Sequence, residues 1–193
     1  MARYLDLLID ANTRFNLTRI TDRAEAETLH LQDSLALLPH LPTVSAGRFD
    51  LADVGSGGGL PGIPLAIVRP HAQVTLVDST GKKADFLRET AETLGLENVE
   101  VFHGRAERMG RDGQFDHVVT RAAGPMSKLL AWCRPLVMKG GVMLAMKGPR
   151  LREELRDAQP IIREQRATIT THPYTLAGQE GRVIAKVTWT RRS

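Results

Sequence analysis

Near the start of the chain, apolar residues recur at the spacing of an amphipathic helix. This spacing is clear over Tyr4–Phe15. A second helix is predicted to begin at Thr21 or Asp22, which are residue types that cap helices, and to end at Pro39. The pattern therefore predicts a helical N-terminal cap over residues 1–48.

Beyond residue 48, short apolar runs alternate with longer amphipathic segments. The runs are typical of buried strands and the segments of helices. Gly95 stands where a helix would stop in the left-handed conformation. The predicted strands are Phe49–Val54, Gln73–Val77, Val99–His103, Phe115–Thr120 and Gly141–Lys147. The predicted helices are Pro61–Arg69, Gly81–Leu94, Met126–Val137 and Leu151–Gln165. This alternation predicts an α/β fold with a mainly parallel sheet.

The last part of the chain has a different pattern. Ala167–Leu176 and Val183–Arg191 are rich in β-branched residues and are joined by a glycine-containing turn. Such a pair is typical of a hairpin, which would add an antiparallel edge to the sheet. We therefore expect residues 49–193 to form the core, in one compact domain with the cap.

A glycine-rich turn follows the first predicted strand. Gly55, Gly57 and Gly59 lie between that strand and a predicted helix, and the next predicted strand is followed by Asp78. A strand, a glycine turn, a helix and a second strand ending in a carboxylate are typical of a nucleotide-binding half-fold. We interpret Asp78 as the acceptor for the two hydroxyl groups of a ribose.

The prolines after the turn bear on which nucleotide it binds. Pro61 and Pro64 remove N–H donors from the first helical turn, where a dinucleotide enzyme would bind pyrophosphate. The spacing also differs from G-x-G-x-x-G. Both features favour a ligand without phosphate, such as S-adenosylmethionine.

Composition narrows the class of protein. The chain has 193 residues, 42% of them hydrophobic and 25% charged, which is ordinary for a globular protein. Its apolar runs are too short to span a membrane, and its N-terminal residues mix charged with apolar side chains, unlike a secretion signal. Cys133 is the single cysteine, which excludes an intramolecular disulfide and a cysteine-cluster metal site. We expect a cytoplasmic protein without a metal or a membrane segment.

The charge pattern indicates an anionic partner. The formal net charge is +4, and several basic residues follow predicted strands, where open parallel sheets bind ligands. Nucleic acid is the favoured partner, although a solvated basic surface or helix start remains an alternative for each of these residues. The candidates for RNA contact are Lys82, Lys83, Arg105, Lys147 and Arg182.

A set of short motifs occurs in order along nearly the whole chain. They are Asn16-Leu17-Thr18, His30-Leu31-Gln32-Asp33-Ser34, Gly59-Leu60-Pro61-Gly62-Ile63-Pro64, Asp78-Ser79-x-x-Lys82-Lys83, Arg105-Ala106-Glu107, Thr120-Arg121-Ala122 and Met146-Lys147-Gly148. Around the glycine turn the sequence resembles class I S-adenosylmethionine-dependent methyltransferases. The ordered set resembles the bacterial 16S rRNA guanine-N7 methyltransferases, also called the glucose-inhibited division protein B family.

The resemblance implies methylation of N7 of one guanine in 16S rRNA, at position 527 in conventional numbering. It implies naked rRNA or the small ribosomal subunit as partner, and we expect a monomer. Carried over by position, cofactor contacts fall on Gly55, Leu60, Ala106, Glu107 and Arg121; Gly57, Gly59 and Asp78 follow from the turn. Arg121, Asn16 and His30 are the candidates for catalytic positioning. The family carries further residues before the segment that matches Tyr4, so an N-terminal helix is expected to be missing or shortened here.

The chemistry agrees with this resemblance. Guanine N7 is an exposed lone pair, so a direct in-line attack on the methyl group needs no general base. The Asn/Asp-Pro-Pro-Tyr/Phe motif typical of amine methylation is replaced by Thr120-Arg121-Ala122-Ala123-Gly124-Pro125. Cys133 lies in an amphipathic segment and is interpreted as a buried structural cysteine, not a nucleophile.

Three rival functions remain open from the sequence. One is a methyltransferase of the same fold with a small-molecule acceptor, against which the basic strand ends argue. Another is a nicotinamide-dependent oxidoreductase, against which the missing G-x-G-x-x-G argues. The third is an RNA-binding protein with a vestigial cofactor fold, whose function would survive replacement of Asp78.

Overall fold

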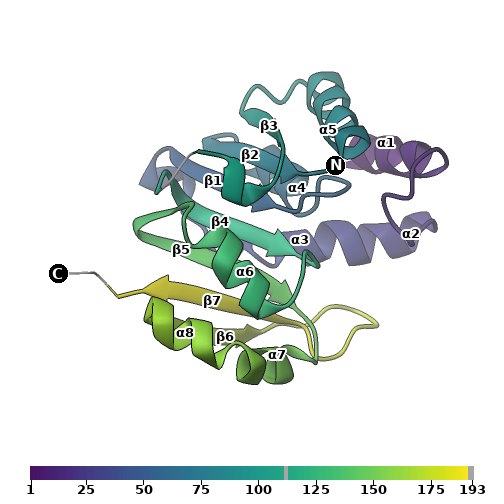
Figure 1. Ribbon diagram of the computed structural model, residues 1–193. Coiled ribbons are helices and arrows are strands. Elements are labelled where there is room, and N and C mark those ends of the chain that lie inside the picture. Colours follow the sequence, from purple (N-terminus) through teal and green to yellow (C-terminus); the bar gives the residue numbers. More distant parts are fainter. Residues whose placement is uncertain (111–112, 191–193) are drawn as a thin grey trace.

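A computed structural model describes residues 1–110 and 113–190. A seven-stranded sheet in the order β3-β2-β1-β4-β5-β7-β6 runs through the middle of the molecule (Figure 1). The strands are β1 Phe49–Val54, β2 Ala72–Asp78, β3 Val99–His103, β4 Phe115–Arg121, β5 Val137–Lys147, β6 Ala167–Pro173 and β7 Val183–Trp189. The first five are parallel, and β7 is antiparallel to both of its neighbours.

The chain order of the strands reverses between β1 and β4, which are direct neighbours. In open parallel sheets this switch point leaves a crevice at the carboxyl ends of the two strands, where ligands bind. The predicted mainly parallel sheet with an antiparallel C-terminal hairpin is confirmed. The last strand ends at Trp189, and Arg191 of its predicted range lies outside the described residues.

The helices of the core are α4 Gly62–Val68, α5 Gly81–Leu94, α6 Met126–Cys133, α7 Leu151–Asp157 and α8 Gln159–Gln165. Gly95 ends α5 with φ +64°, as predicted. The predicted helix Met126–Val137 is too long, because Val137 already pairs with Phe115 at the start of β5. The predicted helix Leu151–Gln165 is interrupted at Ala158, because Pro160 has no N–H to continue the helical hydrogen bonds.

The N-terminal part is less regular than predicted. Helix α1 spans Ala2–Asn12 and ends before Phe15, because the side chain of Asn12 accepts hydrogen bonds from the backbone of Leu17 and Thr18. Asp22 caps α2 (Arg23–Ala26) by accepting from the N–H of Glu25 at 2.8 Å. The predicted second helix then continues as a π-helical turn, the short helix α3 and a 3-10 turn. These three pieces span Glu27–Gln32, Asp33–Leu35 and Leu38–His40.

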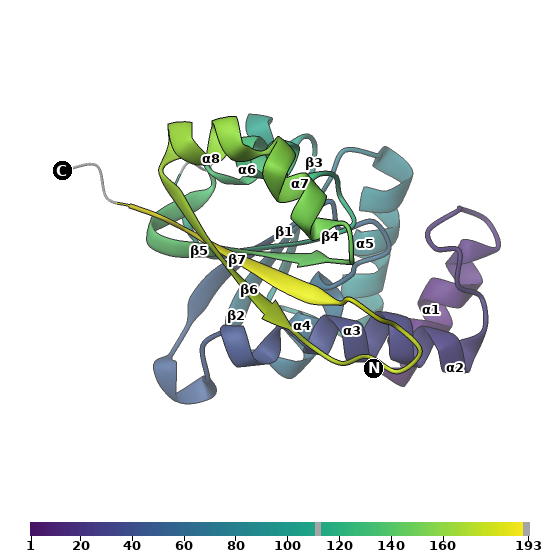
Figure 2. The ribbon, with the colours of Figure 1, turned by 90° about the horizontal axis from the view of Figure 1, so that it is seen from below.

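Helices cover both faces of the sheet (Figure 2). The helices α6, α7 and α8 lie on one face, and α3 and α4 lie on the other. Neighbouring residues of β5 show the alternation: Met143 belongs to the core cluster that contains α6, and Leu144 to the cluster that contains α4. No helix in the described part of the chain is long and apolar enough to cross a membrane.

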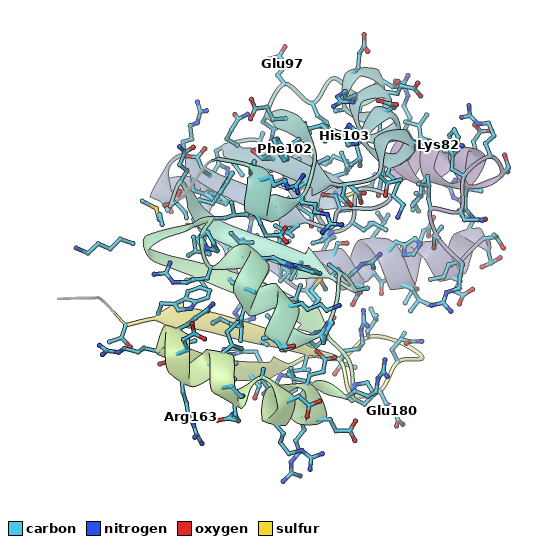
Figure 3. All side chains as sticks on the ribbon, in the orientation of Figure 1. Lys82, Glu97, Phe102, His103, Arg163 and Glu180 are labelled. Carbon is cyan, nitrogen blue, oxygen red and sulfur yellow. The ribbon has the colours of Figure 1, made fainter. Side chains whose placement is uncertain are left out.

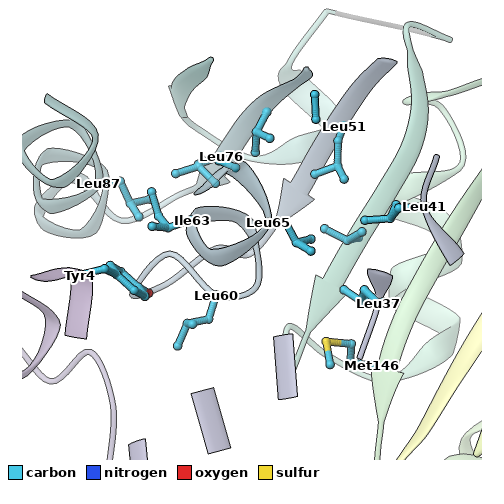
Figure 4. Close-up of a cluster of buried hydrophobic side chains, with 14 of the residues drawn as sticks. Tyr4, Leu37, Leu41, Leu51, Leu60, Ile63, Leu65, Leu76, Leu87 and Met146 are labelled. Carbon is cyan, nitrogen blue, oxygen red and sulfur yellow. The ribbon is translucent and has the colours of Figure 1, made fainter. Parts of the chain in front are cut away.

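The cap packs directly on the glycine turn and on α5. Tyr4 lies beside Leu60, Ile63 and Leu87 in one buried cluster (Figure 4). A division into a cap of residues 1–48 and a core of residues 49–193 stays a prediction. The shared cluster means that the two parts bury apolar surface together.

Candidate active site

A cavity of about 440 Å³ lies at the switch point of the sheet. The ends of β1, β2 and β4 and the loop after β3 form its walls. It is lined by Val54, Gly55, Val77, Asp78, Ser79, Thr80, Lys83, Gly104, Arg105, Ala106, Glu107, Ala122, Ala123 and Trp132. Six of the predicted cofactor or RNA residues therefore share one cavity: Gly55, Asp78, Lys83, Arg105, Ala106 and Glu107.

The glycine turn leaves the cavity open where a ligand can approach. A Cβ on Gly55 would lie 2.7 Å from that of Ala123, and φ is +78° there. At Gly57 φ is +58°, and the nearest atom to a Cβ would be 3.9 Å away. The backbone path at both positions favours glycine, and Gly55 lines the cavity.

The next two glycines serve the packing of the cap. A Cβ on Gly58 would lie 2.7 Å from the side chain of Leu8, and one on Gly59 would lie 2.6 Å from Ile63. Gly57, Gly59 and Leu60 are not among the residues that line the cavity. Their assignment to the cofactor stays a prediction, and packing already accounts for the glycine at positions 58 and 59.

Asp78 holds the turn in place. Its Oδ2 accepts from the N–H of Gly57 and its Oδ1 from the N–H of Thr80, each at 2.9 Å. Each carboxylate oxygen accepts two hydrogen bonds, so one site on each oxygen remains for a ligand such as a ribose. The carboxylate thus faces the cavity in a fixed orientation.

The loop after β3 forms the opposite wall. The N–H of Gly104 donates to the backbone oxygen of Asp78 at 2.9 Å, which brings the 3-10 turn Ala106–Arg108 beside the cavity. Lys82 is exposed at the start of α5 (Figure 3) and is not among the residues that line the cavity, whereas Lys83 is.

Asp53 lies beneath the turn, fully buried. Its Oδ2 accepts from the N–H of Gly62 at 2.9 Å, and its Oδ1 has no partner among the described residues. Burial raises the pKa of this carboxyl from 3.8 to about 7, against smaller lowering effects of Gly62, Ser56 and Arg121. It is part of the glycine stretch, but the sequence did not distinguish it from an ordinary strand residue.

A second cavity, of about 680 Å³, lies along the ends of β4 and β5. Arg121, Lys147 and Arg182 line it, and Ala122 lines both cavities. Ala122 has φ +55°, a left-handed conformation that costs energy for a residue with a Cβ. Such strain is found at functional sites more often than elsewhere.

All three of these cations are already paired inside the protein. Lys147 is buried, forms an ion pair with Glu154 and donates to the backbone oxygen of Gly124 at 2.8 Å. Arg182 pairs with the fully buried Asp33. Contact of Lys147 and Arg182 with RNA stays a prediction. The side chain of Lys147 is less exposed than that of Arg182.

The guanidinium of Arg121 turns toward the cap. Its Nη1 donates to the backbone oxygen of Leu29 at 2.8 Å and to Oδ2 of Asp33 at 3.2 Å. Leu29 lies in the π-helical turn Glu27–Gln32, an irregularity that is frequent at functional sites. Arg121 therefore links the end of β4 to the cap.

His30 is fixed between Arg121 and Thr18. Its Nδ1 lies 3.4 Å from Nη2 of Arg121, and its Nε2 lies 2.9 Å from Oγ1 of Thr18. Because a guanidinium only donates, Nδ1 is the acceptor and Nε2 carries the proton. Burial, helped by Arg121, lowers the pKa of His30 to about 4. The ring is neutral at pH 7 and both nitrogens are occupied.

The remaining predicted residue, Asn16, is exposed and forms no hydrogen bond within the described residues. Thr18, two positions later, contacts His30 instead. Asp33 and Thr18 both stand inside the quoted motifs, but nothing in the sequence marked them as partners. No sequence pattern marked Tyr174 or Glu154 as a residue of the site.

Comparison with known families gives one extended match. The family described as "GidB: rRNA small subunit methyltransferase G" matches residues 1–179. A ribosomal RNA small subunit methyltransferase G of Sorangium cellulosum is 46% identical over 184 residues, covering 94% of this chain and 75% of that protein. One of Lactobacillus delbrueckii subsp. bulgaricus is 43% identical over 180 residues, covering 91% of this chain and 75% of the relative.

Solved structures share the fold at much lower identity. A SAM dependent methyltransferase from Aquifex aeolicus superposes with a TM-score of 0.63 at 14% identity, covering 89% of this chain and 95% of the other. A ribosomal protein methylase from Lactobacillus delbrueckii subsp. bulgaricus reaches 0.62 at 14% identity, with 83% and 78% covered. Both are similar to this chain in architecture.

Proposed function

The chain belongs to the rRNA small subunit methyltransferase G family and is an S-adenosylmethionine-dependent methyltransferase. From this premise we propose that it methylates N7 of a guanine in 16S rRNA, at position 527 in conventional numbering. Its partner is 16S rRNA or the small ribosomal subunit. The enzyme acts as a monomer, and its substrate implies action in the cytoplasm.

The cavity at the switch point fits the cofactor. Asp78 would bind the ribose, Gly55 and Gly57 would allow the methionine part to approach the backbone, and Ala106 and Glu107 would bind the adenine side. The cofactor supplies a methyl group on a positively charged sulfur. Arg105 and Lys83 at the rim favour an anionic partner beside this charge.

The observation that carries the proposal is the meeting of the two cavities at Ala122. An acceptor base bound in the second cavity would face the cofactor across this residue. Arg121 and Arg182 on the wall of the second cavity supply the charge that an RNA backbone needs. A small uncharged acceptor would not need these two positively charged side chains.

The environment of His30 supports attack without a general base. Guanine N7 has a lone pair and carries no proton, so the acceptor would need no residue to remove a proton before it takes the methyl group. His30 has both nitrogens engaged, so this chain contributes by orienting the base in line with the methyl group.

The test combines labelled S-adenosylmethionine with small subunits, naked 16S rRNA and a metabolite extract. N7-methylguanosine at the proposed position, mapped by cleavage at the modified base, is the expected result. Label in another base or another RNA would overturn the proposed position. Label only in small molecules would overturn the RNA substrate.

The replacement Asp78→Ala separates an enzyme from an RNA-binding protein with a vestigial fold. We expect loss of cofactor binding and of methylation, with RNA binding retained. Retention of methylation would contradict the proposed role of Asp78.

A further inference from the structure

Asp33 joins three distant segments of the chain. Its side chain is fully buried, and it accepts hydrogen bonds from Arg121 at the end of β4 and from Tyr174 and Arg182, which flank the loop between β6 and β7. The distances are 3.2 Å from Nη1 of Arg121, 2.6 Å from the hydroxyl of Tyr174 and 3.2 Å from Nε of Arg182. Nη2 of Arg182 donates to the same carboxylate.

The charges of this cluster do not cancel. Two guanidinium groups share one carboxylate. The low pKa of His30 keeps its ring neutral, and Tyr174 remains a protonated donor because burial and Asp33 raise its pKa. Arg121 also interacts electrostatically with Asp53. The carboxyl of Asp53 has a pKa of about 7, so it is only partly ionised at pH 7. The cluster therefore keeps an excess of positive charge that is smaller than one unit, and a largely buried excess charge favours an anionic ligand.

Both guanidinium groups keep an edge free. Arg182 uses Nε and Nη2 on Asp33, and its Nη1 has no partner within the described residues. The Nε of Arg121 likewise has none there. Both side chains line the 680 Å³ cavity, and they are 17% and 23% exposed. Asp33 thus binds one side of each guanidinium group, and the nitrogens without a partner remain available to a ligand in the cavity.

We propose that Asp33 is a positioning residue, which holds Arg121 and Arg182 as a paired binding site for one RNA phosphate beside the target nucleotide. The planar fork of arginine matches a phosphate in two hydrogen bonds, and fixing the fork in advance removes the cost of ordering it on binding. The inference rests on the proposed RNA substrate and adds a site to it.

The charge of Asp33 gives the test a definite sign. Replacing it by asparagine makes the protein one unit more positive. If the two arginines acted only as unpositioned charges, Asp33→Asn would bind RNA more tightly. If Asp33 positions them, RNA binding weakens in spite of the added charge. A general loss of folding would weaken cofactor binding as well.

The experiment compares Asp33→Asn with Asp6→Asn, a matched control that adds the same charge at an exposed ion pair of the cap. For Asp33→Asn we expect kcat/KM for the small subunit and RNA affinity to fall about tenfold or more, because a buried charge pair is broken. Cofactor affinity by calorimetry should stay within about twofold, because the cofactor cavity does not include Asp33. Unchanged or tighter RNA binding by Asp33→Asn would overturn the proposal.

Arg182→Lys provides a second, independent arm in case Asp33→Asn unfolds. Lysine keeps the charge but lacks the fork, so we expect it to lose as much RNA affinity as Arg182→Gln. A lysine variant with wild-type affinity would show that charge alone is needed. Mapping the nucleotide that the wild-type protein methylates tests the proposed function separately. If that nucleotide is a different one, the proposed position is wrong. The effect of Asp33→Asn can still be measured on that nucleotide.

Discussion

The hydroxyl of Tyr4 donates a hydrogen bond to the backbone oxygen of Gly58 at 2.7 Å, which ties α1 to the glycine turn across 54 residues of chain. Tyr4 is fully buried, and burial raises the pKa of its hydroxyl well above the usual range. The phenol is therefore a permanent donor. This hydrogen bond thus fixes the first helix against the glycine turn.

Replacement Tyr4→Phe is expected to destabilise the protein. It leaves the oxygen of Gly58 buried without a donor, which costs about 1–2 kcal/mol. For a chain of this size each kcal/mol lowers the melting temperature by about 2–4 °C. Thermal unfolding followed by circular dichroism measures the change. An unaltered melting temperature would show that water replaces the lost donor.

The glycines of the turn are expected to differ in whether their replacement lowers stability or cofactor affinity. A Cβ on Gly62 would lie 2.2 Å from the side chain of Leu76 and 2.8 Å from Asp53, so Gly62→Ala should cost about 3 kcal/mol of stability. A Cβ on Gly57 would meet only the backbone oxygen of Gly55, at 3.9 Å, so Gly57→Ala should cost about 1 kcal/mol from its left-handed backbone. Its larger effect should be on cofactor affinity.

Gly95→Ala is the control for that comparison. Gly95 has φ +64° and nothing within 4 Å of a Cβ, so it carries similar backbone strain outside the cavity. Denaturant unfolding and calorimetric titration with the cofactor separate the two effects. Equal cofactor affinity of Gly57→Ala and Gly95→Ala would contradict the role of Gly57.

The raised pKa of Asp53 predicts a pH dependence of stability. The folded state binds this proton more tightly than the unfolded state, whose pKa is near 3.8. Asp53 therefore favours folding at low pH, and this contribution is lost as pH rises from 3.8 through about 7. Relative to wild type, Asp53→Asn should gain stability between about pH 5 and pH 8.

Urea unfolding without cofactor at several pH values measures this difference. Asp6→Asn, which removes a carboxylate at an exposed position, is the control measured in parallel. Parallel curves for wild type and Asp53→Asn would show that Asp53 is ionised throughout.

His30 is expected to be absent from the pH–rate profile. With a pKa of about 4, its ring does not change charge between about pH 6 and pH 8. Rates of methylation per enzyme, measured with saturating cofactor, should show no step that His30→Asn removes. A step near pH 6.5 that this variant abolishes would assign His30 an acid–base role.

The positions of the strands could be predicted from the sequence because each strand is a short apolar run between polar segments. Errors arose where apolar residues suit two elements. Val137 fits the end of an amphipathic helix as well as the start of a strand, and only its pairing with Phe115 decides between them. The π-helical turn in the cap has the same apolar spacing as an α-helix, so the pattern could not indicate it.

The cofactor side of the site was easier to predict than the acceptor side. Asp78 and Ala106 follow parallel strands, and the fold alone brings strand ends together. Asp33 and Tyr174 are 141 residues apart and lie in irregular segments, so no local pattern relates them. Gly59 was attributed to the ligand, which stays a prediction, and its close contact with Ile63 of α4 could not be read from the sequence.

The bond between Asp33 and Arg182 spans 149 residues, which has a consequence for synthesis of the protein. On the ribosome the glycine turn, Asp78 and Arg121 emerge long before Arg182. A growing chain can therefore form its cofactor pocket while Asp33 has Arg121 as a partner but not yet Tyr174 or Arg182. The two halves of the site mature at different times, and the half that faces RNA is completed last.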